Sequence, residues 1–405
     1  MGTDKIKDIF ENIDQEEVVV LTEKLIEIES HKESVQRESA VAYYIQSFFR
    51  SHDIEAWTEE IYPNRPNIYA KVGKSDKSYK RIILNGHIDT VPAYTMENAF
   101  QPKRKENDLY GRGAVDMKGA IAAMMVAMVT LKRYYPNLAG EVIFAGVIDE
   151  EERAEGARHI ADSGNLTADI AIIGEPTELK IMPAHKGMEW TEVAFHGKSS
   201  HGSTPNAGIN AVYHASEFIR IMQENLLPEL ERREHPVLGK PTLNLGKIIG
   251  GSDPNVVPDK CFLQFDRRWL PGESTESMIE EFNNLVRIQK KTNPSIEVSV
   301  RRMSETTGYH PPLDTPFDHW GVKALEKGVR TLFGRDPEVV MFPGWSDGAQ
   351  LANGGIPSVV CGPGRLEDAH SGKEKINMNE LYQAAVLYTY FALDITGRGK
   401  NESGK

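Results

Sequence analysis

The sequence predicts an α/β protein with a mainly parallel sheet and a smaller α+β domain inserted into it. In the first part of the chain, short apolar segments alternate with amphipathic helical segments, which is typical of a parallel sheet covered on both faces. Half-exposed strands and two helices then replace this pattern, and the first pattern returns towards the C-terminus. The length of 405 residues also exceeds that of one ordinary core, so two domains are expected.

The periodicity of each segment predicts its element. Apolar residues three and four apart indicate helices, short apolar runs indicate buried strands, and strict alternation indicates half-exposed strands. The elements expected before the insertion are helices 15–30, 38–52, 117–134 and 155–163, with strands 67–72, 81–89, 141–148 and 169–174. Those expected inside it are strands 189–197, 242–249, 260–270 and 296–302, with helices 210–225 and 276–290. Those expected after it are helices 317–332, 346–352 and 379–395, with strands 338–342 and 357–361. The expected boundaries are therefore 1–186 and 303–405 for the larger domain and 187–302 for the inserted one.

Composition excludes several classes of protein. Lys plus Arg number 47 against 59 Asp plus Glu, which gives a net charge of −12. Because phosphate contacts need clustered cations, we expect no nucleic-acid partner. The two cysteines, Cys261 and Cys361, are too few for a disulfide framework or a cysteine-rich zinc site. Both lie beside apolar residues, which is typical of small buried side chains.

The chain shows no pattern of a membrane protein. Its N-terminal segment is charged and lacks the apolar core of a signal peptide. The longest uncharged apolar stretch, residues 119–131, is too short to span a bilayer and is expected to form a buried helix. We therefore expect a cytoplasmic protein without a membrane partner.

Acidic residues and histidines follow several of the predicted strands, where an open α/β sheet places its active site. His87 and Asp89 end one strand, and the acidic residues 149–151 end another. Carboxylates gathered at one edge repel one another and resist ionisation, and metal ions between them remove that repulsion. The candidate metal ligands at these positions are His87, Asp116, Glu151, Glu175 and His370.

These five residues can hold two divalent ions if one carboxylate bridges them. Asp116 is the expected bridge, because it lies in the tight turn GRGAVDMKG between the two ligand sets. Each ion then has three protein ligands and an open position for water, which is the pattern of catalytic zinc. Two ions about 3.5–4 Å apart can share a hydroxide and stabilise a tetrahedral intermediate. We expect zinc, with cobalt or manganese as alternatives, since mixed histidine and carboxylate sites accept several ions.

Two further acids are expected to assist the ligands. Asp89 points to the same side of its strand as His87, two residues before it, and can hydrogen-bond the ring nitrogen of His87 that faces away from the metal. Glu150 and Glu151 are adjacent on what should be an extended segment, so they are expected to face opposite ways. We therefore assign Glu151 to a metal. Glu150 is the expected general base for the attacking water and later the proton donor to the leaving amine.

At this point the residues match a known family. The motifs GHIDTVPA, GRGAVDMKG, DEEE, IGEPTE, GKSSHGSTPNAGINA, SDGAQL and AHSGKE occur in the order seen in the M20 metallopeptidase/deacylase family. This superfamily contains acetylornithine deacetylase, succinyl-diaminopimelate desuccinylase, aminoacylase-1 and carboxypeptidase G2. The resemblance covers nearly the whole chain, from about residue 21 to the last predicted helix.

The resemblance implies a zinc-exopeptidase-like catalytic domain and a ferredoxin-like lid domain through which such proteins usually form homodimers. It assigns His87, Asp116 and Glu175 to one metal. It assigns Asp116, Glu151 and His370 to the other. It also implies a cis peptide bond after the bridging aspartate.

The lid motifs resemble the family's substrate-binding residues. His201 matches the histidine that reaches the partner subunit's active site and stabilises the oxyanion of the intermediate. Asn255 and Arg268 match residues that hold the substrate, often at its carboxylate, which suits the fork of an arginine. Apart from the resemblance, the backbone NH groups of Gly362 and Gly364 in the CGPG loop can also bind a carboxylate. A tight turn explains these two glycines almost equally well.

The function expected from these observations is hydrolysis of the amide bond of a small N-acyl amino acid by a metal-bridging water that Glu150 activates. The alternative is a dipeptidase or carboxypeptidase that uses the same chemistry. A catalytically inactive binding protein would lack a ligand or Glu150, and all these positions are filled. A nucleotide-binding α/β protein is not expected, because the run GRGAVDMKG lacks the glycine and lysine spacing of nucleotide-binding loops.

Overall fold

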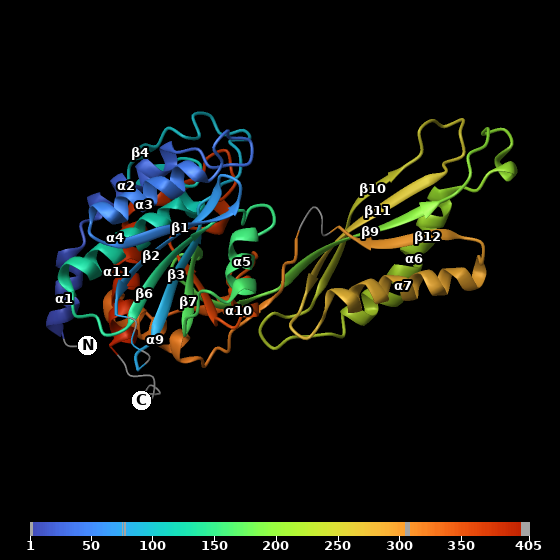
Figure 1. Cartoon of the computed structure of the whole chain (residues 1–405). Coiled ribbons are helices and arrows are strands. Elements are labelled where there is room, and N and C mark those ends of the chain that lie inside the picture. Colours follow the sequence, from blue (N-terminus) through green and yellow to red (C-terminus); the bar gives the residue numbers. More distant parts are fainter. Residues whose placement is uncertain (1–2, 75, 77, 304–307, 398–405) are drawn as a thin grey trace. The chain divides into compact units, whose positions relative to one another are not determined.

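The computed structural model describes residues 3–74, 76, 78–303 and 308–397. The chain divides into two compact units. The first unit consists of Met1–His185 together with Leu313–Lys405, and the second unit is Lys186–Pro312. The second unit therefore ends at Pro312, whereas the expected limit was residue 302. Figure 1 shows the helices and strands of both units.

The first unit is built on a mixed nine-stranded sheet within the described residues. Its strands, in spatial order, are β1 (Glu55–Tyr62), β2 (Arg65–Gly73), β6 (Glu141–Val147), β3 (Arg81–His87), β7 (Ile170–Pro176), β15 (Ser358–Gly362), β8 (Ile181–His185) and β13 (Leu313–Asp314), and β14 (Val339–Met341) pairs with β8. The central strands β6, β3, β7 and β15 run parallel, whereas both flanks contain antiparallel pairs. The α/β class is thus confirmed.

Connection length explains which pairs are parallel. Only two residues join β1 to β2, and a connection this short produces an antiparallel hairpin. The helix α4 (Gly119–Tyr134) lies between β3 and β6, and α5 (Glu155–Ser163) lies between β6 and β7. Crossovers of this kind return the chain in the same direction. The sequence did not predict the hairpin strand β1 or the strand β8.

Helices cover both faces of this sheet, as Figure 1 shows. The buried apolar residues of this unit form two clusters, one on each face of the sheet. The larger cluster includes α4 and most of the other helices, whereas α5 and α10 (Gly348–Asn353) contribute to the smaller one. Alternate residues of β3 enter different clusters: Ile82 and Leu84 belong to the first and Ile83 to the second. The remaining helices of the first unit are α1 (Thr3–Asn12), α2 (Gln15–Glu27), α3 (Ser39–Ser51), α9 (Trp320–Phe333), α10 (Gly348–Asn353) and α11 (Met378–Thr396).

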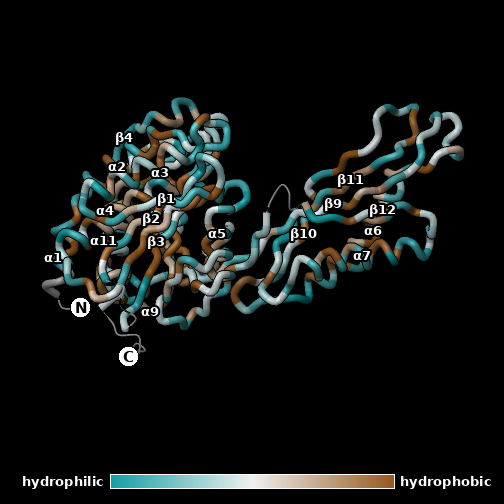
Figure 2. The backbone as a smooth tube through the Cα atoms, viewed as in Figure 1, coloured by the Kyte–Doolittle hydropathy of each residue, from teal (hydrophilic) through white to brown (hydrophobic). Residues whose placement is uncertain are grey.

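The apolar character of the strands and of α4 reflects this burial. Figure 2 shows hydrophobic residues gathered along the central strands of the first unit. Among the described residues, one helical stretch, Ala114–Tyr134, is long and apolar enough to cross a membrane, and its most apolar window is completely buried. The prediction of a buried helix at 119–131 is therefore confirmed.

A small three-stranded sheet in the first unit was not predicted. Its strands are β4 (Lys103–Lys105), β5 (Asp108–Tyr110) and β16 (Lys375–Asn377). The pairing of β5 with β16 joins segments that are far apart in the sequence. It brings the residues before the GRGAVDMKG turn next to the residues after the AHSGKE motif.

The second unit has the element order β-α-β-β-α-β. Its elements are β9 (Gly187–His196), α6 (Ala211–Leu230), β10 (Thr242–Gly250), β11 (Lys260–Trp269), α7 (Thr275–Thr292) and β12 (Glu297–Arg302). The strands form an antiparallel sheet in the order β10-β11-β9-β12, which is the ferredoxin-like arrangement. Phe195 and Phe265 pack on Phe218 of α6 and Phe282 of α7, so both helices cover the same face.

Candidate metal centre and active site

Asp116 lies between two histidines that come from distant parts of the chain. His87 is the last residue of β3, and its Nε2 lies 2.9 Å from Oδ1 of Asp116. His370 follows the last central strand, and its Nε2 lies 3.1 Å from Oδ2 of Asp116. Each carboxylate oxygen of Asp116 therefore faces a different histidine, which is the arrangement that a bridging metal ligand requires.

Two glutamates each lie near a different histidine of this group. Oε1 of Glu175, near the end of β7, lies 3.6 Å from Nε2 of His87. Oε1 of Glu151 lies 3.0 Å from Nε2 of His370. The structure thus brings together all five candidate ligands, in pairs that match the two expected sets.

Among the described residues, two groups of three side chains could each hold a metal ion, because the ligand atoms within each group lie within 4.8 Å of one another. One consists of His87, Asp116 and Glu151, and the other of His87, Glu150 and Glu175. Oε1 of Glu175 is buried and accepts no hydrogen bond from any described residue. Neutral imidazole nitrogen and carboxylate oxygen are ligands that zinc, cobalt and manganese accept. The residues present therefore fit a site for divalent cations.

The segment that carries Glu150 and Glu151 is a turn, not the extended segment expected from the sequence. Asp149 begins it with a left-handed backbone (φ 70°). The carbonyl oxygen of Asp149 accepts hydrogen bonds from the NH groups of Arg153 (2.9 Å) and Ala154 (2.6 Å). The two glutamates still belong to different ligand groups, but a folded turn separates them rather than the alternation of a strand.

Asp89 supports both His87 and this turn. Nδ1 of His87 lies 3.0 Å from the backbone carbonyl oxygen of Asp89 and 3.5 Å from its Oδ1. The carboxylate of Asp89 accepts hydrogen bonds from the NH groups of Glu150 (3.3 Å) and Glu151 (3.1 Å). The closer contact to the imidazole is thus made by the backbone of Asp89. The carboxylate mainly orders the turn, which the sequence did not indicate.

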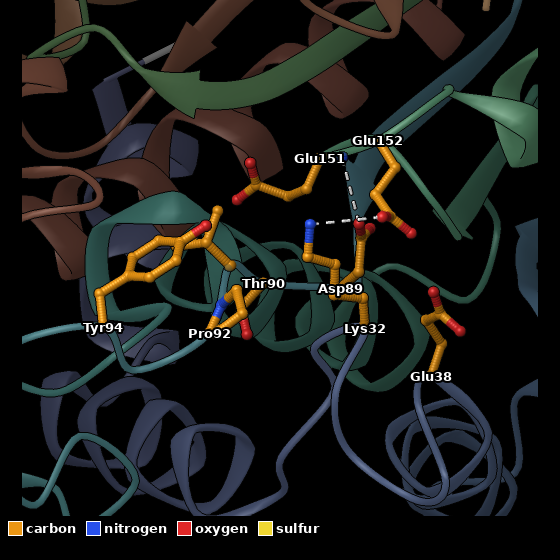
Figure 3. A pocket seen from close by; sticks show the side chains of 9 residues that line it. Lys32, Glu38, Asp89, Thr90, Pro92, Tyr94, Glu151 and Glu152 are labelled. Atoms are coloured by element: carbon orange, nitrogen blue, oxygen red, sulfur yellow. Dashed lines mark hydrogen bonds and ion pairs between the residues drawn. The ribbon is translucent and has the colours of Figure 1, made fainter. Parts of the chain in front are cut away.

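A small cavity lies beside Asp89 and Glu151 (Figure 3). Lys32 reaches across it to Glu152, with Nζ 3.6 Å from Oε1. The other residues that line the cavity are Glu38, Thr90, Val91, Pro92 and Tyr94.

A buried ion pair supports the turn that carries Asp116. Arg112 and Glu374 pair with almost no exposure to solvent. Oε1 of Glu374 accepts hydrogen bonds from the NH groups of Val115 (3.2 Å) and Asp116 (3.4 Å). The peptide bond from Asp116 to Met117 is cis, as the family resemblance implies. Arg112 and Glu374 belong to the two quoted motifs GRGAVDMKG and AHSGKE, but only the folded chain shows that they meet.

Opposite charges shift the pKa values of the histidines and of Asp116. Burial alone would lower the pKa of His87, but hydrogen bonds with Asp116 and Asp89 raise it well above its ordinary value. Hydrogen bonds with Asp116 and Glu151 raise the pKa of His370 to about 11. Burial would raise the pKa of Asp116, but hydrogen bonds from His370 and His87 lower it. The carboxylate of Asp116 therefore attracts both histidines and is stabilised in its charged form by them.

For Glu150, Glu175 and Asp347, burial outweighs the attraction of His87. Burial raises the pKa of Glu150 and Glu175 well above the ordinary value, and neighbouring carboxylates raise it further. Burial also raises the pKa of Asp347 to about 8. An excess of buried negative charge is what bound cations would neutralise.

Asp347 is a site residue that the sequence analysis missed. It precedes α10, is 1% exposed, and neither carboxylate oxygen has a hydrogen-bond partner among the described residues. Its charge raises the pKa of both Glu150 and Glu175, so it lies beside the candidate metal centre. It occurs in the quoted motif SDGAQL, and its place shortly after a strand was the signal that could have found it.

Three other predicted site residues, His201, Asn255 and Arg268, lie in the second unit. His201 and Asn255 belong to neighbouring loops, joined by the hydrogen bond from the NH of Gly202 to the carbonyl oxygen of Asn255 (2.7 Å). Nδ1 of His201 lies 2.7 Å from Oγ of Ser203 and 3.2 Å from the backbone nitrogen of the same residue. The imidazole is exposed.

The two adjacent arginines of β11 face opposite sides of their sheet. Arg267 is buried and pairs with Glu273 at 2.7 Å. Arg268 is half-exposed and pairs with Asp266 at 2.9 Å. Arg268 is therefore the one of the two that remains accessible, and its contact with substrate stays a prediction.

The argument for a carboxylate site at the CGPG loop does not hold. The NH of Gly362 donates to Oγ1 of Thr177 (3.1 Å), and the NH of Gly364 donates to Oε2 of Glu380 (2.8 Å). A Cβ atom on Gly362 would lie 2.2 Å from the carbonyl oxygen of Gly174. The two glycines therefore permit close packing, and their NH groups are already occupied.

Comparison with known proteins decides the family. The sequence profile of peptidase family M20/M25/M40 matches residues 83–394, which include the five candidate ligands. The chain belongs to this family. It is therefore a hydrolase, as the sequence predicted.

Two relatives of this M20 protein remove acyl groups. It is 28% identical over 411 residues to N-formyl-4-amino-5-aminomethyl-2-methylpyrimidine deformylase of Halalkalibacterium halodurans, covering 93% of this chain and 94% of the relative. It is 31% identical over 329 residues to acetylornithine deacetylase of Vibrio cholerae, covering 78% of this chain and 81% of the relative.

Solved structures share the fold. A tripeptidase from Staphylococcus aureus superimposes with a TM-score of 0.77 at 21% identity, covering 95% of this chain and 100% of that one. The YXEP protein of Bacillus subtilis, a dinuclear metal-binding peptidase of the M20 family, has a TM-score of 0.70 at 16% identity, with 95% and 98% coverage. At these identities the likeness concerns the fold alone.

Proposed function

We propose that this M20 protein hydrolyses the amide bond of an N-acyl amino acid, using two divalent cations. One cation would be held by His87, Asp116 and Glu175, and the other by Asp116, Glu151 and His370. The observation that carries the proposal is the position of Asp116, with one carboxylate oxygen 2.9 Å from His87 and the other 3.1 Å from His370. Zinc is the cation that we expect, and cobalt or manganese suits the same ligands.

The chain's own residues would move the protons of the reaction. When bound, the cations would supply Lewis acidity for the carbonyl oxygen and for water. Glu150 would accept a proton from the attacking water at a carboxylate oxygen and deliver it to the nitrogen of the leaving amine. Burial raises the pKa of Glu150, which suits a group that must both take and release a proton.

The second unit would bind the substrate as a lid and would join two subunits into a homodimer. His201 would donate a hydrogen bond to the oxyanion. Asn255 and Arg268 would hold the substrate. The edge strand β10 exposes Ile248 (57%) and Ile249 (43%), which favours association through this edge. Mixing inactive His201→Ala and Glu150→Gln subunits should restore activity if His201 acts in the partner's site. No recovery in verified heterodimers would contradict that action.

Cleavage of a dipeptide is the second candidate. Asp347 favours it, because a buried carboxylate without a partner beside the metal centre is suited to a substrate ammonium group. An N-acyl amino acid derived from a neutral amino acid has no such group, whereas a dipeptide does. The acyl-group chemistry in the names of the two relatives favours the deacylase.

Paired substrates distinguish the two functions. Release of free amine is measured from N-acetyl and N-succinyl amino acids and from dipeptides with the same leaving amino acid, with protein loaded with zinc, cobalt or manganese. Faster release from the acyl amino acids supports the deacylase, and faster release from the dipeptides supports the peptidase. If neither class is hydrolysed with any of the three metals, the proposal is wrong. The Glu150→Gln variant serves as the inactive control.

A further inference from the structure

Strand β2 begins with an arginine that binds two buried carboxylates next to the candidate active site. Nε of Arg65 donates to Oε2 of Glu38 at 2.8 Å. Nη2 of Arg65 lies 2.5 Å from Oε1 of Glu38 and 2.5 Å from Oδ1 of Asp149. The side chains are 14%, 3% and 3% exposed, in the order Arg65, Glu38 and Asp149. One guanidinium thus donates charge-assisted hydrogen bonds to two buried carboxylates.

Asp149 is the residue on which the turn with Glu150 and Glu151 depends. It has a left-handed backbone, and its carbonyl oxygen accepts the NH groups that close the turn. Its side chain is free to take another rotamer unless something holds it. The contact with Arg65 holds it to the first residue of β2, so the start of the turn is fixed to the sheet.

Asn67, two residues further along β2, holds the two ends of the same segment. Its Oδ1 accepts a hydrogen bond from the NH of Ile148 (3.1 Å), and its Nδ2 donates to the carbonyl oxygen of Gly156 (3.0 Å). Arg65 and Asn67 point to the same side of β2, because side chains two apart on a strand do so. Strand β2 therefore contacts the segment at residues 148, 149 and 156.

Asp89 completes the support by accepting the NH groups of Glu150 and Glu151. Figure 3 shows Asp89, Glu38 and Glu151 around the small cavity beside the site. We propose that Arg65 is a positioning residue, which fixes the general base Glu150 and the metal ligand Glu151 by anchoring Asp149. Arg65 acts through this turn, and no role in contact with substrate is assigned to it.

The positioning role of Arg65 depends on the shape of its guanidinium group as well as on its charge. Lysine keeps the positive charge but has a single ammonium group, which cannot hold both carboxylates in the fork geometry of Arg65. In Arg65→Lys, the turn should lose its fixed orientation while the charge balance is kept. A displacement of about 1 Å at a catalytic group reduces turnover by about 100-fold.

The first test measures turnover, and it rests on the proposed function. With the better substrate class and saturating metal, Arg65→Lys should lower kcat about 10- to 100-fold. KM should stay within about 2-fold of the wild-type value, because the substrate contacts are unchanged. A merely structural role would leave the kcat of the folded fraction unchanged.

The second test does not depend on turnover. Co²⁺ is titrated into the metal-free protein and followed by its visible absorption, in competition with a chelator. Arg65→Lys should weaken binding of at least one Co²⁺ about 10- to 100-fold, since Glu151 would be misplaced. If the wild-type protein hydrolyses neither substrate class, the proposed function fails, and the cobalt titration still decides the role of Arg65.

Arg81→Lys is the matched control. Arg81 begins β3 and pairs with Glu141 at 2.6 Å, at the end of that strand opposite to His87, about 20 Å away. This variant should lower Tm but retain wild-type kcat and cobalt affinity. The proposal is overturned if Arg65→Lys behaves in the same way. If Arg65→Lys does not fold, Asp149→Asn, which removes only the charge, replaces it. This variant must lower both kcat and cobalt affinity, and wild-type values of the two would again overturn the proposal.

Discussion

The NH group of Glu151 donates a hydrogen bond to Oδ2 of Asp89 at 3.1 Å. This contact joins the strand end that carries the first candidate ligand, His87, to the turn that carries another. The same carboxylate accepts the NH of Glu150 at 3.3 Å. A single acid therefore sets the distance between a histidine ligand and the expected general base.

Asp116→Ala should remove both metal ions together. Each oxygen of Asp116 faces a different histidine, so one substitution deprives both sites of a charged ligand. Metal content per chain, measured after dialysis against zinc buffer, should fall from about two to near zero. Asp336→Ala is the control, because Asp336 is exposed and pairs with Arg330 on the surface. Loss of a single ion in Asp116→Ala would show that Asp116 does not bridge.

Glu150→Gln should abolish turnover and leave metal content near two per chain. The amide keeps the size of the side chain but cannot accept the proton of the attacking water, so kcat should fall about 100-fold or more. Glu152→Gln, in the same turn, is the matched control, since Glu152 pairs with Arg37 (3.2 Å) and Lys32 (3.6 Å). Retained turnover in Glu150→Gln would exclude this residue as the base.

His319 should make the stability of the first unit depend on pH. It precedes α9, and its Nδ1 accepts the NH of Gly321 at 3.2 Å, which only the unprotonated nitrogen can do. Burial, with the nearby charge of Lys80, lowers the pKa of His319 from its ordinary value of 6.5. The folded state therefore favours the neutral ring. This contribution is present above pH 6.5 and is lost as the pH falls through 6.5 towards the folded pKa.

The variant His319→Asn checks this dependence. Asparagine also accepts the NH group at a helix N-terminus, and it does not titrate. The urea midpoints of both proteins are measured at about pH 7.5 and about pH 5.5, on either side of the histidine transition. The decrease on acidification should be smaller in the variant. An equal decrease in both proteins would contradict the role of His319.

Gly156→Ala should destabilise the protein and impair turnover at the same time. A Cβ at this position would lie 2.5 Å from Oδ1 of Asn67 and 2.5 Å from the backbone nitrogen of Ile148. The backbone NH of Ile148 donates a hydrogen bond to Oδ1 of Asn67, and this hydrogen bond holds the turn that carries Glu150. A Cβ at position 156 would therefore force both atoms to shift. The cost should be about 1–3 kcal/mol in the free energy of unfolding.

The control for Gly156→Ala is Gly246→Ala in the second unit. The nearest atom to a Cβ at Gly246 is 3.5 Å away, so alanine fits without displacement. Urea unfolding of the metal-free proteins and kcat of the loaded proteins are compared. Equal stability and equal kcat for the two variants would show that the segment near Gly156 can move without consequence.

The sequence by itself determined the α/β class, the family and the residues of the candidate metal centre. His87 and Glu175 end apolar runs, and the carboxyl ends of parallel strands meet at one edge of a sheet, so their proximity follows from local patterns. Asp116 was recognisable because a glycine-rich turn sets it between strands. Hydrophobic periodicity and strand-end chemistry are local properties, and a sequence displays them directly.

Only the tertiary structure decided how these residues are supported. Asp149 and Arg65, or Arg112 and Glu374, are far apart in the chain, and nothing local indicates that they form buried pairs. The segment at Glu150 is a turn and not the expected extended segment. The carboxylate of Asp89 and the backbone carbonyl of Asp149 accept hydrogen bonds from its NH groups. The NH groups of Gly362 and Gly364 are occupied for the same reason, by partners from other segments. Hydrogen bonds between distant segments depend on the packing of the whole unit, which no single stretch of sequence contains.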